Sequence, residues 1–350
     1  MNNPESRPVH NTKNIDLLRG SAAMLVVMSH LQPIINLGWF GQEGGWVGVQ
    51  LFFVISGYLI IQSAYKYTAK EYFTHRVFRI FPAYLFWYIL FGLISGKLVG
   101  AALTDPYFYA NLVLLQHFIP EAYLRYTFIN PSWTLSVEWG WYILAIILAM
   151  TNRKYILPYF LISIVVSTWW TAGGWMHHPL AEAMSKQDPV YSYFFLTNNL
   201  IGQLPFFLMG SVIYFYRPRL PMIPVVIASV LILITFRKWA SYFPNPIFIT
   251  GLALGGVFWA FVNLKRTFHG PVVRFLSDTS YSIYLVHFSV IAYISTRVEN
   301  KYAMTLVSLV VIFVLAYLSY RFIEKPSMDF GRRLAKRFSP ATADAPRVQP

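Results

Sequence analysis

Long apolar runs, each close to 20 residues and almost free of charge, recur along the chain. A bilayer core about 30 Å thick requires about 20 apolar residues for each helical span. Only 12% of the residues are charged and 56% are hydrophobic, whereas a soluble domain carries roughly 25% charged residues. The sequence therefore predicts an all-α membrane protein, a polytopic bundle of about ten transmembrane helices.

The expected spans follow from the positions of these runs. They lie near residues 15–36, 46–65, 77–96, 134–151, 155–172, 196–216, 221–237, 246–264, 277–295 and 302–323. The link between the third and fourth spans contains a weaker apolar piece, YFYANLVLLQHF, for which we expect a re-entrant or interfacial helix.

The spans divide the chain into three parts. We expect a cytoplasmic N-terminal tail at 1–13, a transmembrane domain at 14–327 and a basic, disordered cytoplasmic tail at 328–350. The first ten residues are polar, and the first apolar run is longer than the hydrophobic region of a signal peptide, so no cleavable leader is expected.

The basic residues indicate an orientation. With the N-terminus inside, 21 of the 28 Lys and Arg residues fall on the inner side. The outer side holds the other seven, which are Lys97, Arg125, Lys186, Arg237, Lys238, Arg297 and Lys301. Because cytoplasmic loops are enriched in Lys and Arg, both termini are expected in the cytoplasm and the chain in the bacterial inner membrane. The net charge of +14 then reflects basic loops against anionic lipid rather than a nucleic-acid partner.

Several kinds of chemistry are excluded or disfavoured. The chain has no cysteine, which excludes disulfides, thiolate metal sites and cysteine nucleophiles. No two histidines are three or four residues apart, and the adjacent His177 and His178 diverge on any regular element, so no metal site is expected. Nucleotide-binding glycine motifs and the G-x-S-x-G nucleophile motif do not occur.

Arg19 and His30 bracket ten uncharged residues of the first span. Eleven residues at about 100° each amount to three turns plus roughly 20°, so both side chains project from nearly one helix face, about 16 Å apart along the axis. His30 is then expected near the middle of the bilayer, where an ionisable group typically marks a pathway or a reaction site. A structural histidine bonded to a neighbouring helix is equally consistent with the position.

Other polar groups lie inside or beside the apolar runs. Arg76 and Arg79 are neighbours on one helix surface and suit a phosphate ligand, although anchoring at the cytoplasmic face explains them too. Pro82 follows and is expected to kink that helix. Glu138 lies within the fourth span, where a carboxylate needs a partner such as His30, Arg19 or the arginine pair.

The remaining polar residues of the spans are candidates to line a cavity. They are Gln50 in the second span, Ser136 in the fourth and Ser280, Tyr284 and His287 in the ninth. Hydrogen bonding between helices explains them equally well. At the end of the tenth span, local pairing is the simplest interpretation of Arg321, Glu324 and Lys325.

Taken in order, these motifs resemble the acyltransferase-3 family of integral membrane O-acyltransferases. The resemblance rests on Arg19-x10-His30, GVQLFFVISGYLI, RVFRIFP, WTLSVEW, SYSIYLVH and IEKP, which cover roughly residues 11–327. It implies transfer of an acyl group, usually acetyl, from cytoplasmic acyl-CoA to a hydroxyl of a cell-surface or lipid-linked glycan, such as O-antigen of lipopolysaccharide or an exopolysaccharide. It also implies the stand-alone form, without an SGNH domain, and no bound cofactor beyond acyl-CoA as co-substrate.

The resemblance also assigns roles. Arg19 and His30 match an essential motif whose histidine is implicated in acyl transfer, and Arg76 and Arg79 match a motif associated with the acyl donor. Glu138 occupies an acidic position of less settled role. A neutral His30 would act as general base toward the acceptor hydroxyl or take the acyl group itself, while Arg19 would hold donor phosphate.

Two other functional classes remain open from the residues alone. Buried His, Glu and Arg side chains also suit a proton-coupled transporter or flippase for a glycolipid or organic anion, although the chain has no repeated halves of the kind many carriers show. A structural partner in a glycan assembly complex would leave the Arg19–His30 face unexplained.

Overall fold

A computed structural model describes residues 13–42, 44–171, 198–216, 218, 220–235 and 246–338, and this part of the chain forms helices and no strands. The longer helices run in chain order and are α1 (Lys13–Leu31), α3 (Gly44–Lys66), α4 (Ala69–Ile94), α7 (Trp133–Ala149), α8 (Ile156–Thr171), α11 (Leu200–Tyr216), α12 (Met222–Thr235), α13 (Pro246–Asn263), α14 (Pro271–Ser295), α15 (Lys301–Ser319) and α16 (Lys325–Ala335).

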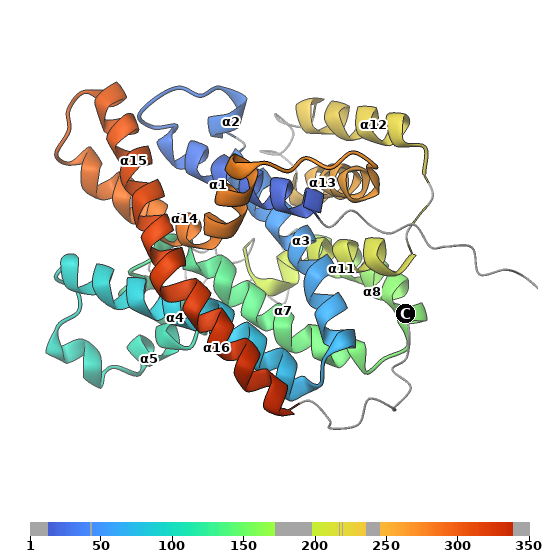
Figure 1. Cartoon of the computed structure of the whole chain (residues 1–350), viewed down its shortest axis with the longest axis horizontal. Helices are drawn as coiled ribbons and strands as arrows, with labels where there is room; N and C mark the ends of the chain where they lie inside the picture. Colours follow the sequence, from blue (N-terminus) through green and yellow to red (C-terminus); the bar gives the residue numbers. More distant parts are fainter. Residues whose placement is uncertain are drawn as a thin grey trace, which may run out of the picture.

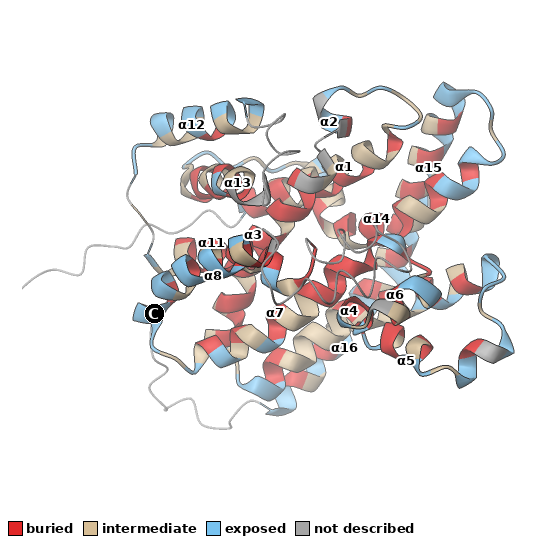
Figure 2. Cartoon of the chain, turned by 180° about the vertical axis from the view of Figure 1, so that it is seen from behind, coloured by how far each residue is buried: buried red, intermediate tan, exposed pale blue. Residues whose placement is uncertain are grey.

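Helix α3 lies at the centre of the bundle and packs against α1, α7, α11 and α13 (Figure 1). Its sequence is almost wholly apolar, so it can be surrounded by other helices without burying unpaired charge. Helix α14 packs between α1 and α15, and the buried residues concentrate where these helices meet (Figure 2). Helix α12 lies at the edge and buries only Ser229, which suits a helix that faces lipid.

Each predicted span overlaps one of these helices, so the predicted all-α architecture is confirmed. Among the described residues, four helical stretches are long and apolar enough to cross a membrane, and three helices are apolar but shorter. The long stretches are Val47–Lys66, Ala69–Ile94, Asn130–Ala149 and Lys301–Phe338. The chain is thus an integral membrane protein by composition and helix length, and the count of ten spans stays a prediction.

The first helix is shorter than predicted. Helix α1 ends at Leu31 rather than at residue 36, and a turn follows in which the Ile34 amide donates to the Leu31 carbonyl at 3.0 Å. Pro33 explains the early end, because it lacks an amide hydrogen and disfavours helical backbone in the residue before it. His30 therefore lies in the last turn of α1, and its expected depth near the middle of the bilayer stays a prediction.

The link between α4 and α7 forms a series of short helices rather than one re-entrant helix. They include two helices of seven residues, Pro106–Leu112 (α5) and Pro120–Tyr126 (α6), each begun by a proline. Two tyrosines of α4 fix the link, since the Tyr84 hydroxyl donates to the Asn111 carbonyl and the Tyr88 hydroxyl to the Tyr126 carbonyl, both at 2.8 Å. Helix α4 itself runs unbroken through Pro82.

The C-terminal helices form one long rod, the orange and red helix that crosses Figure 1. Helix α15 passes into α16 through a π-helical turn, Tyr320–Glu324. The disorder expected from residue 328 onward is wrong for 328–338, because α16 packs against α4, with Gly331 directly over the ring of Phe78. Residues 339–350 lie outside the described part.

The π-helical turn places Glu324 in the interior. Its side chain is fully buried, accepts a hydrogen bond from Ser282 of α14 and lies 3.6 Å from the Arg79 guanidinium of α4. Arg321 and Lys325 are exposed. The local pairing predicted for Glu324 is therefore wrong: its partners come from two other helices, because the π turn rotates it away from its sequence neighbours.

Glycines allow α3 and α11 to approach most closely. A Cβ at Gly57 would lie 2.0 Å from the Phe207 carbonyl oxygen, and a Cβ at Gly210 would lie 2.1 Å from the Val54 carbonyl oxygen. Small residues at such crossings are typical of helix pairs in membranes, where packing rather than burial from water drives association.

We expect Gly57→Ala and Gly210→Ala to lower the thermal unfolding temperature of the purified protein in detergent. The added methyl group meets backbone, which cannot rotate away, so the two helices must separate at a cost of about 1–3 kcal/mol. Gly100→Ala is the control, because nothing lies within 4 Å of a Cβ there. Equal melting temperatures for all three variants would contradict the close crossing.

We also expect Glu324→Ala to destabilise the protein far more than Asp329→Ala. Removing Glu324 leaves the half-buried Arg79 without its carboxylate, at a cost of about 1–3 kcal/mol. Asp329 pairs with Arg332 at the surface, and exposed pairs contribute only about 0–1 kcal/mol. Thermal unfolding of the two variants measures the difference, and similar losses would show that the Arg79–Glu324 pair does not stabilise the fold.

Candidate active site

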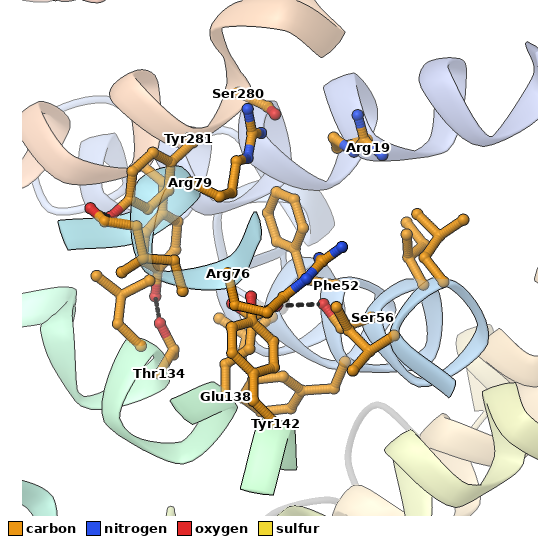
Figure 3. A pocket seen from close by; sticks show the side chains of 18 residues that line it. Arg19, Phe52, Ser56, Arg76, Arg79, Thr134, Glu138, Tyr142, Ser280 and Tyr281 are labelled. Carbon is orange, nitrogen blue, oxygen red and sulfur yellow. Dashed lines mark hydrogen bonds between the residues drawn. The ribbon is translucent and has the colours of Figure 1, made fainter. Parts of the chain in front are cut away.

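A cavity of about 140 Å³ lies within the bundle, between α1, α3, α4, α7 and α14. Figure 3 shows polar side chains that converge on it from all five helices. Its polar lining consists of Arg19, Ser56, Arg76, Arg79, Thr134, Glu138, Tyr142, Ser280, Tyr281 and Tyr284. The cavity thus contains both arginine motifs and the carboxylate that the sequence singled out.

A second, wider hollow of about 520 Å³ adjoins the cavity, and we call it the vestibule. Its lining residues are Arg19, Leu59, Gln62, Ser63, Lys66, Tyr67, His75, Arg76, Arg79, Met328 and Arg332. Four of them, including all three arginines of the cavity, line both spaces. Five lining residues of the vestibule carry positive charge, and no carboxylate is among the described residues that line it.

Arg76 is held by neutral groups. It donates to the Ser63 hydroxyl at 3.2 Å, and its guanidinium lies over the rings of Tyr72 and Tyr142 at 5.8 and 5.7 Å from their centroids. Aromatic faces attract a cation without neutralising it. The positive charge of Arg76 therefore stays available to an anion in the vestibule.

Arg79 is held more tightly, by three helices. Its guanidinium lies 3.6 Å from the Glu324 carboxylate, donates to the Met328 sulfur at 2.9 Å and lies over the ring of Tyr281 at 5.8 Å. Arg76 and Arg79 line the same two spaces, as their spacing of three residues predicts. The sequence did not indicate Glu324 as a partner of this pair.

Arg19 faces α14, where it donates to the Ser277 hydroxyl at 3.5 Å, and it lies 3.7 Å from the Asp16 carboxylate. Ser277 in turn donates to Asp16 at 2.9 Å. Sequence reasoning missed Asp16 and Ser277, although the spacing of three residues between Asp16 and Arg19 would have indicated the first contact.

Glu138 points into the cavity from α7 (Figure 3). Its carboxylate accepts a hydrogen bond from the Ser56 hydroxyl of α3 at 2.6 Å. The sequence suggested His30 or an arginine as the partner, whereas the observed one is a neutral hydroxyl. Glu138 still shares the cavity with Arg19, Arg76 and Arg79.

Two of the five predicted cavity-lining residues line this cavity. Ser280 and Tyr284 do, and the Tyr284 hydroxyl accepts from Thr134 at 2.8 Å. Gln50 instead accepts from Thr250 of α13 at 3.1 Å. Ser136 donates to the Leu114 carbonyl in the link before α7. Both are held by neighbouring segments, which is the alternative that the sequence left open.

His287, the fifth of these residues, and His30 lie beyond Tyr284 and do not line the cavity. The ring centroids of Tyr284 and His287 are 5.7 Å apart, and His287 Nε2 lies 3.3 Å from His30 Nδ1. Arg19 and His30 thus both contact α14, as the predicted common face requires. His177 and His178 lie outside the described residues.

Comparisons with known proteins identify the family of the chain. The family model described as an "Acyltransferase domain" matches residues 12–321. The peptidoglycan O-acetyltransferase OatA of Listeria monocytogenes is 24% identical over 91% of this chain, which covers 56% of that protein. No solved structure matches.

Two further relatives are similar along most of their length. The acyltransferase MdmB of Streptomyces mycarofaciens is 27% identical over 87% of both chains, and the O-acetyl transferase of Shigella phage Sf6 is 27% identical over 91% of this chain and 96% of its own. The family model extends from the start of α1 to the π-helical turn and includes the arginines, the carboxylate and both histidines of the site. The chain therefore belongs to the acyltransferase-3 family of integral membrane O-acyltransferases.

Proposed function

We propose that the chain transfers an acyl group, most simply acetyl, from acyl-CoA to a hydroxyl of a cell-surface or lipid-linked glycan. Coenzyme A carries its phosphates at one end and the thioester at the other, joined by a long flexible arm. The donor then binds with its phosphates in the vestibule and its thioester directed through the cavity toward Tyr284, beyond which His30 lies.

The observation that carries this proposal is the charge of the vestibule. Lys66 and Arg332 join the three arginines, and no described carboxylate faces the space. Several cations around one hollow attract a multiply charged anion and raise its local concentration. Arginine forks also match phosphate oxygens in geometry. The narrower cavity behind the vestibule suits the slender acyl-bearing arm rather than the nucleotide.

The acceptor is proposed from the relatives. One of them is a peptidoglycan O-acetyltransferase, and this chain spans 56% of its length. A glycan hydroxyl is the corresponding acceptor here. It approaches from the end of the bundle where α1 ends at Leu31, opposite the vestibule, because His30 lies at that end.

The membrane topology is part of the proposal. Ten spans place both termini in the cytoplasm of a bacterial inner membrane, and the vestibule then opens where cytoplasmic acyl-CoA is present. The excess of basic residues in the loops assigned to this side supports the orientation. The exposed basic residues of α16, among them Arg332 and Arg333, suit contact with anionic headgroups at the same surface.

In the reaction, the hydroxyl oxygen of the acceptor bonds to the thioester carbonyl carbon and the carbon–sulfur bond breaks. The acceptor proton ends on the sulfur, so that the products are an ester and free coenzyme A. His30 carries the proton between them as a base, or carries the acyl group between them as a nucleophile. Arg19 holds the donor from the vestibule side, and Glu138 faces the donor path.

We expect His30→Ala to lower transfer from labelled acetyl-CoA in membrane vesicles by about 10²- to 10⁴-fold, the usual contribution of a general acid–base group. Binding of acetyl-CoA should be unchanged, because His30 does not line the vestibule. His269→Ala is the control, since His269 lies in an exposed loop before α14. Wild-type transfer by a folded His30→Ala protein would contradict the catalytic assignment.

We expect Arg76→Ala to weaken acetyl-CoA binding by about 10- to 100-fold, because a charge-assisted hydrogen bond contributes about 1.5–3 kcal/mol. Isothermal titration of the purified protein measures the affinity. Arg79→Ala should act in the same direction with an added loss of stability, since Glu324 loses its partner.

The matched control for these variants is Arg333→Ala, which removes an exposed arginine that does not line the vestibule. It should bind acetyl-CoA as the wild type does. Unchanged affinity in Arg76→Ala, or an equal loss in Arg333→Ala, would contradict a specific donor site in the vestibule.

A further inference from the structure

His30 and His287 form a contact pair between the last turn of α1 and the middle of α14. His287 is fully buried and His30 is half-buried. Their ring centroids are 4.9 Å apart with the planes at 60°, and His287 Nε2 lies 3.3 Å from His30 Nδ1. Phe288 contacts the His30 ring edge-on at 5.2 Å. The rings therefore meet through their nitrogens, not by stacking.

The surroundings of His287 decide which of its nitrogens carries hydrogen. Nδ1 lies 2.8 Å from the Tyr284 carbonyl oxygen and 3.2 Å from that of Ile283. Carbonyl oxygens only accept hydrogen bonds, so Nδ1 is the donor. In a neutral imidazole the other nitrogen then has the lone pair. His287 Nε2 therefore presents an acceptor to His30.

The surroundings of His30 decide its tautomer in the same way. Nδ1 lies 2.9 Å from the Val26 carbonyl oxygen. The Ser29 hydroxyl, 3.5 Å away, gives its own hydrogen to Val26. Each neighbour of His30 Nδ1, including His287 Nε2, is thus an acceptor, and Nδ1 must carry the hydrogen. The lone pair of neutral His30 is on Nε2.

We propose that His287 is a positioning residue for acyl transfer, which shares the Nδ1 hydrogen of His30 with the Val26 carbonyl and orients the ring with Nε2 free to react. This inference rests on the proposed function of His30. A base oriented by an acceptor on its far nitrogen is the arrangement of many catalytic histidines. His287 differs from the usual carboxylate in being neutral, which suits a fully buried position where an unpaired charge is costly.

The pair has the same task in both routes of transfer. As a base, His30 Nε2 takes the proton of the acceptor hydroxyl while its oxygen attacks the thioester, and returns that proton to the departing sulfur. As a nucleophile, Nε2 takes the acyl group, the sulfur leaves, and the acceptor oxygen then displaces the imidazole. In each case positive charge develops on His30, and the Nδ1 hydrogen bond to His287 stabilises it.

Kinetics of purified variants test the proposal. His287→Leu, which has no acceptor, should lower kcat by about 10- to 100-fold with little change in KM for acetyl-CoA. His287→Gln should restore much of kcat, since its side-chain oxygen can accept from His30 Nδ1. Phe288→Leu, which alters the packing of His30 but no hydrogen bond, should retain most activity.

Equal losses in His287→Leu and His287→Gln, or a loss of the same size in Phe288→Leu, would show that His287 acts only through packing. Nitrogen-15 NMR of histidine-labelled protein supplies a readout that needs no activity. The chain has eight histidines, so the His30 signals can be assigned by their loss in His30→Ala. We expect the hydrogen on Nδ1 in the wild type, and in His287→Leu the same tautomer with a changed Nδ1 chemical shift, because the Val26 carbonyl still accepts while the contact with His287 Nε2 is lost.

A wild-type His30 with its hydrogen on Nε2 would overturn the positioning role of His287. The proposed function is tested separately. If His30→Ala transfers acyl groups at the wild-type rate, the proposed function fails, whichever tautomer His30 has in the wild type.

Discussion

The buried ion pair between Arg79 and Glu324 connects the helices on which the site depends. Glu324 belongs to the π-helical turn before α16, Arg79 belongs to α4, and Ser282 of α14 donates to the same carboxylate. A half-buried cation in an apolar bundle has little water to solvate it, so the protein must supply its partners. One carboxylate thus fixes the position of a cavity arginine and the docking of the C-terminal helix at once. The vestibule exists because α16, which contributes Met328 and Arg332, is held against α4.

Of the two arginines of α4, Arg79 is paired with a carboxylate and Arg76 is held by neutral groups. This difference determines the net charge of the site. Arg79 is largely compensated by Glu324. Arg76 has a serine hydroxyl and two aromatic rings, and its Nε makes no hydrogen bond with any described residue. Its charge is therefore supported but not neutralised. If both arginines only anchored the helix, pairing each with a carboxylate would stabilise the protein more. One arginine paired with a carboxylate, Arg79, and one with neutral partners only, Arg76, suit the binding of an anion.

Much of this site was predictable because helical spacing is a local property. The common face of Arg19 and His30, and the adjacency of Arg76 and Arg79, follow from angles along one helix. The membrane class follows from hydropathy alone. The partners of Glu324 and Glu138 did not follow, because they belong to other helices whose rotation no single-helix pattern fixes. Gln50 and Ser136 show the same limit. A polar residue in a span gives the same sequence pattern whether its side chain faces a cavity or a neighbouring helix.

The two ends of the Arg19–His30 motif lie in different electrostatic surroundings. Permanent charge is most costly deep in a membrane, and the cations of the site gather around the vestibule. Toward the histidines the polar groups are hydroxyls and imidazoles, which include Thr134, Tyr284 and His287. Glu138 is the exception, and it lies among the arginines with a serine hydroxyl bonded to it. Under the proposed function, the chain keeps fixed charge where the anionic donor enters and uses neutral, titratable groups at the far end, where protons and acyl groups move.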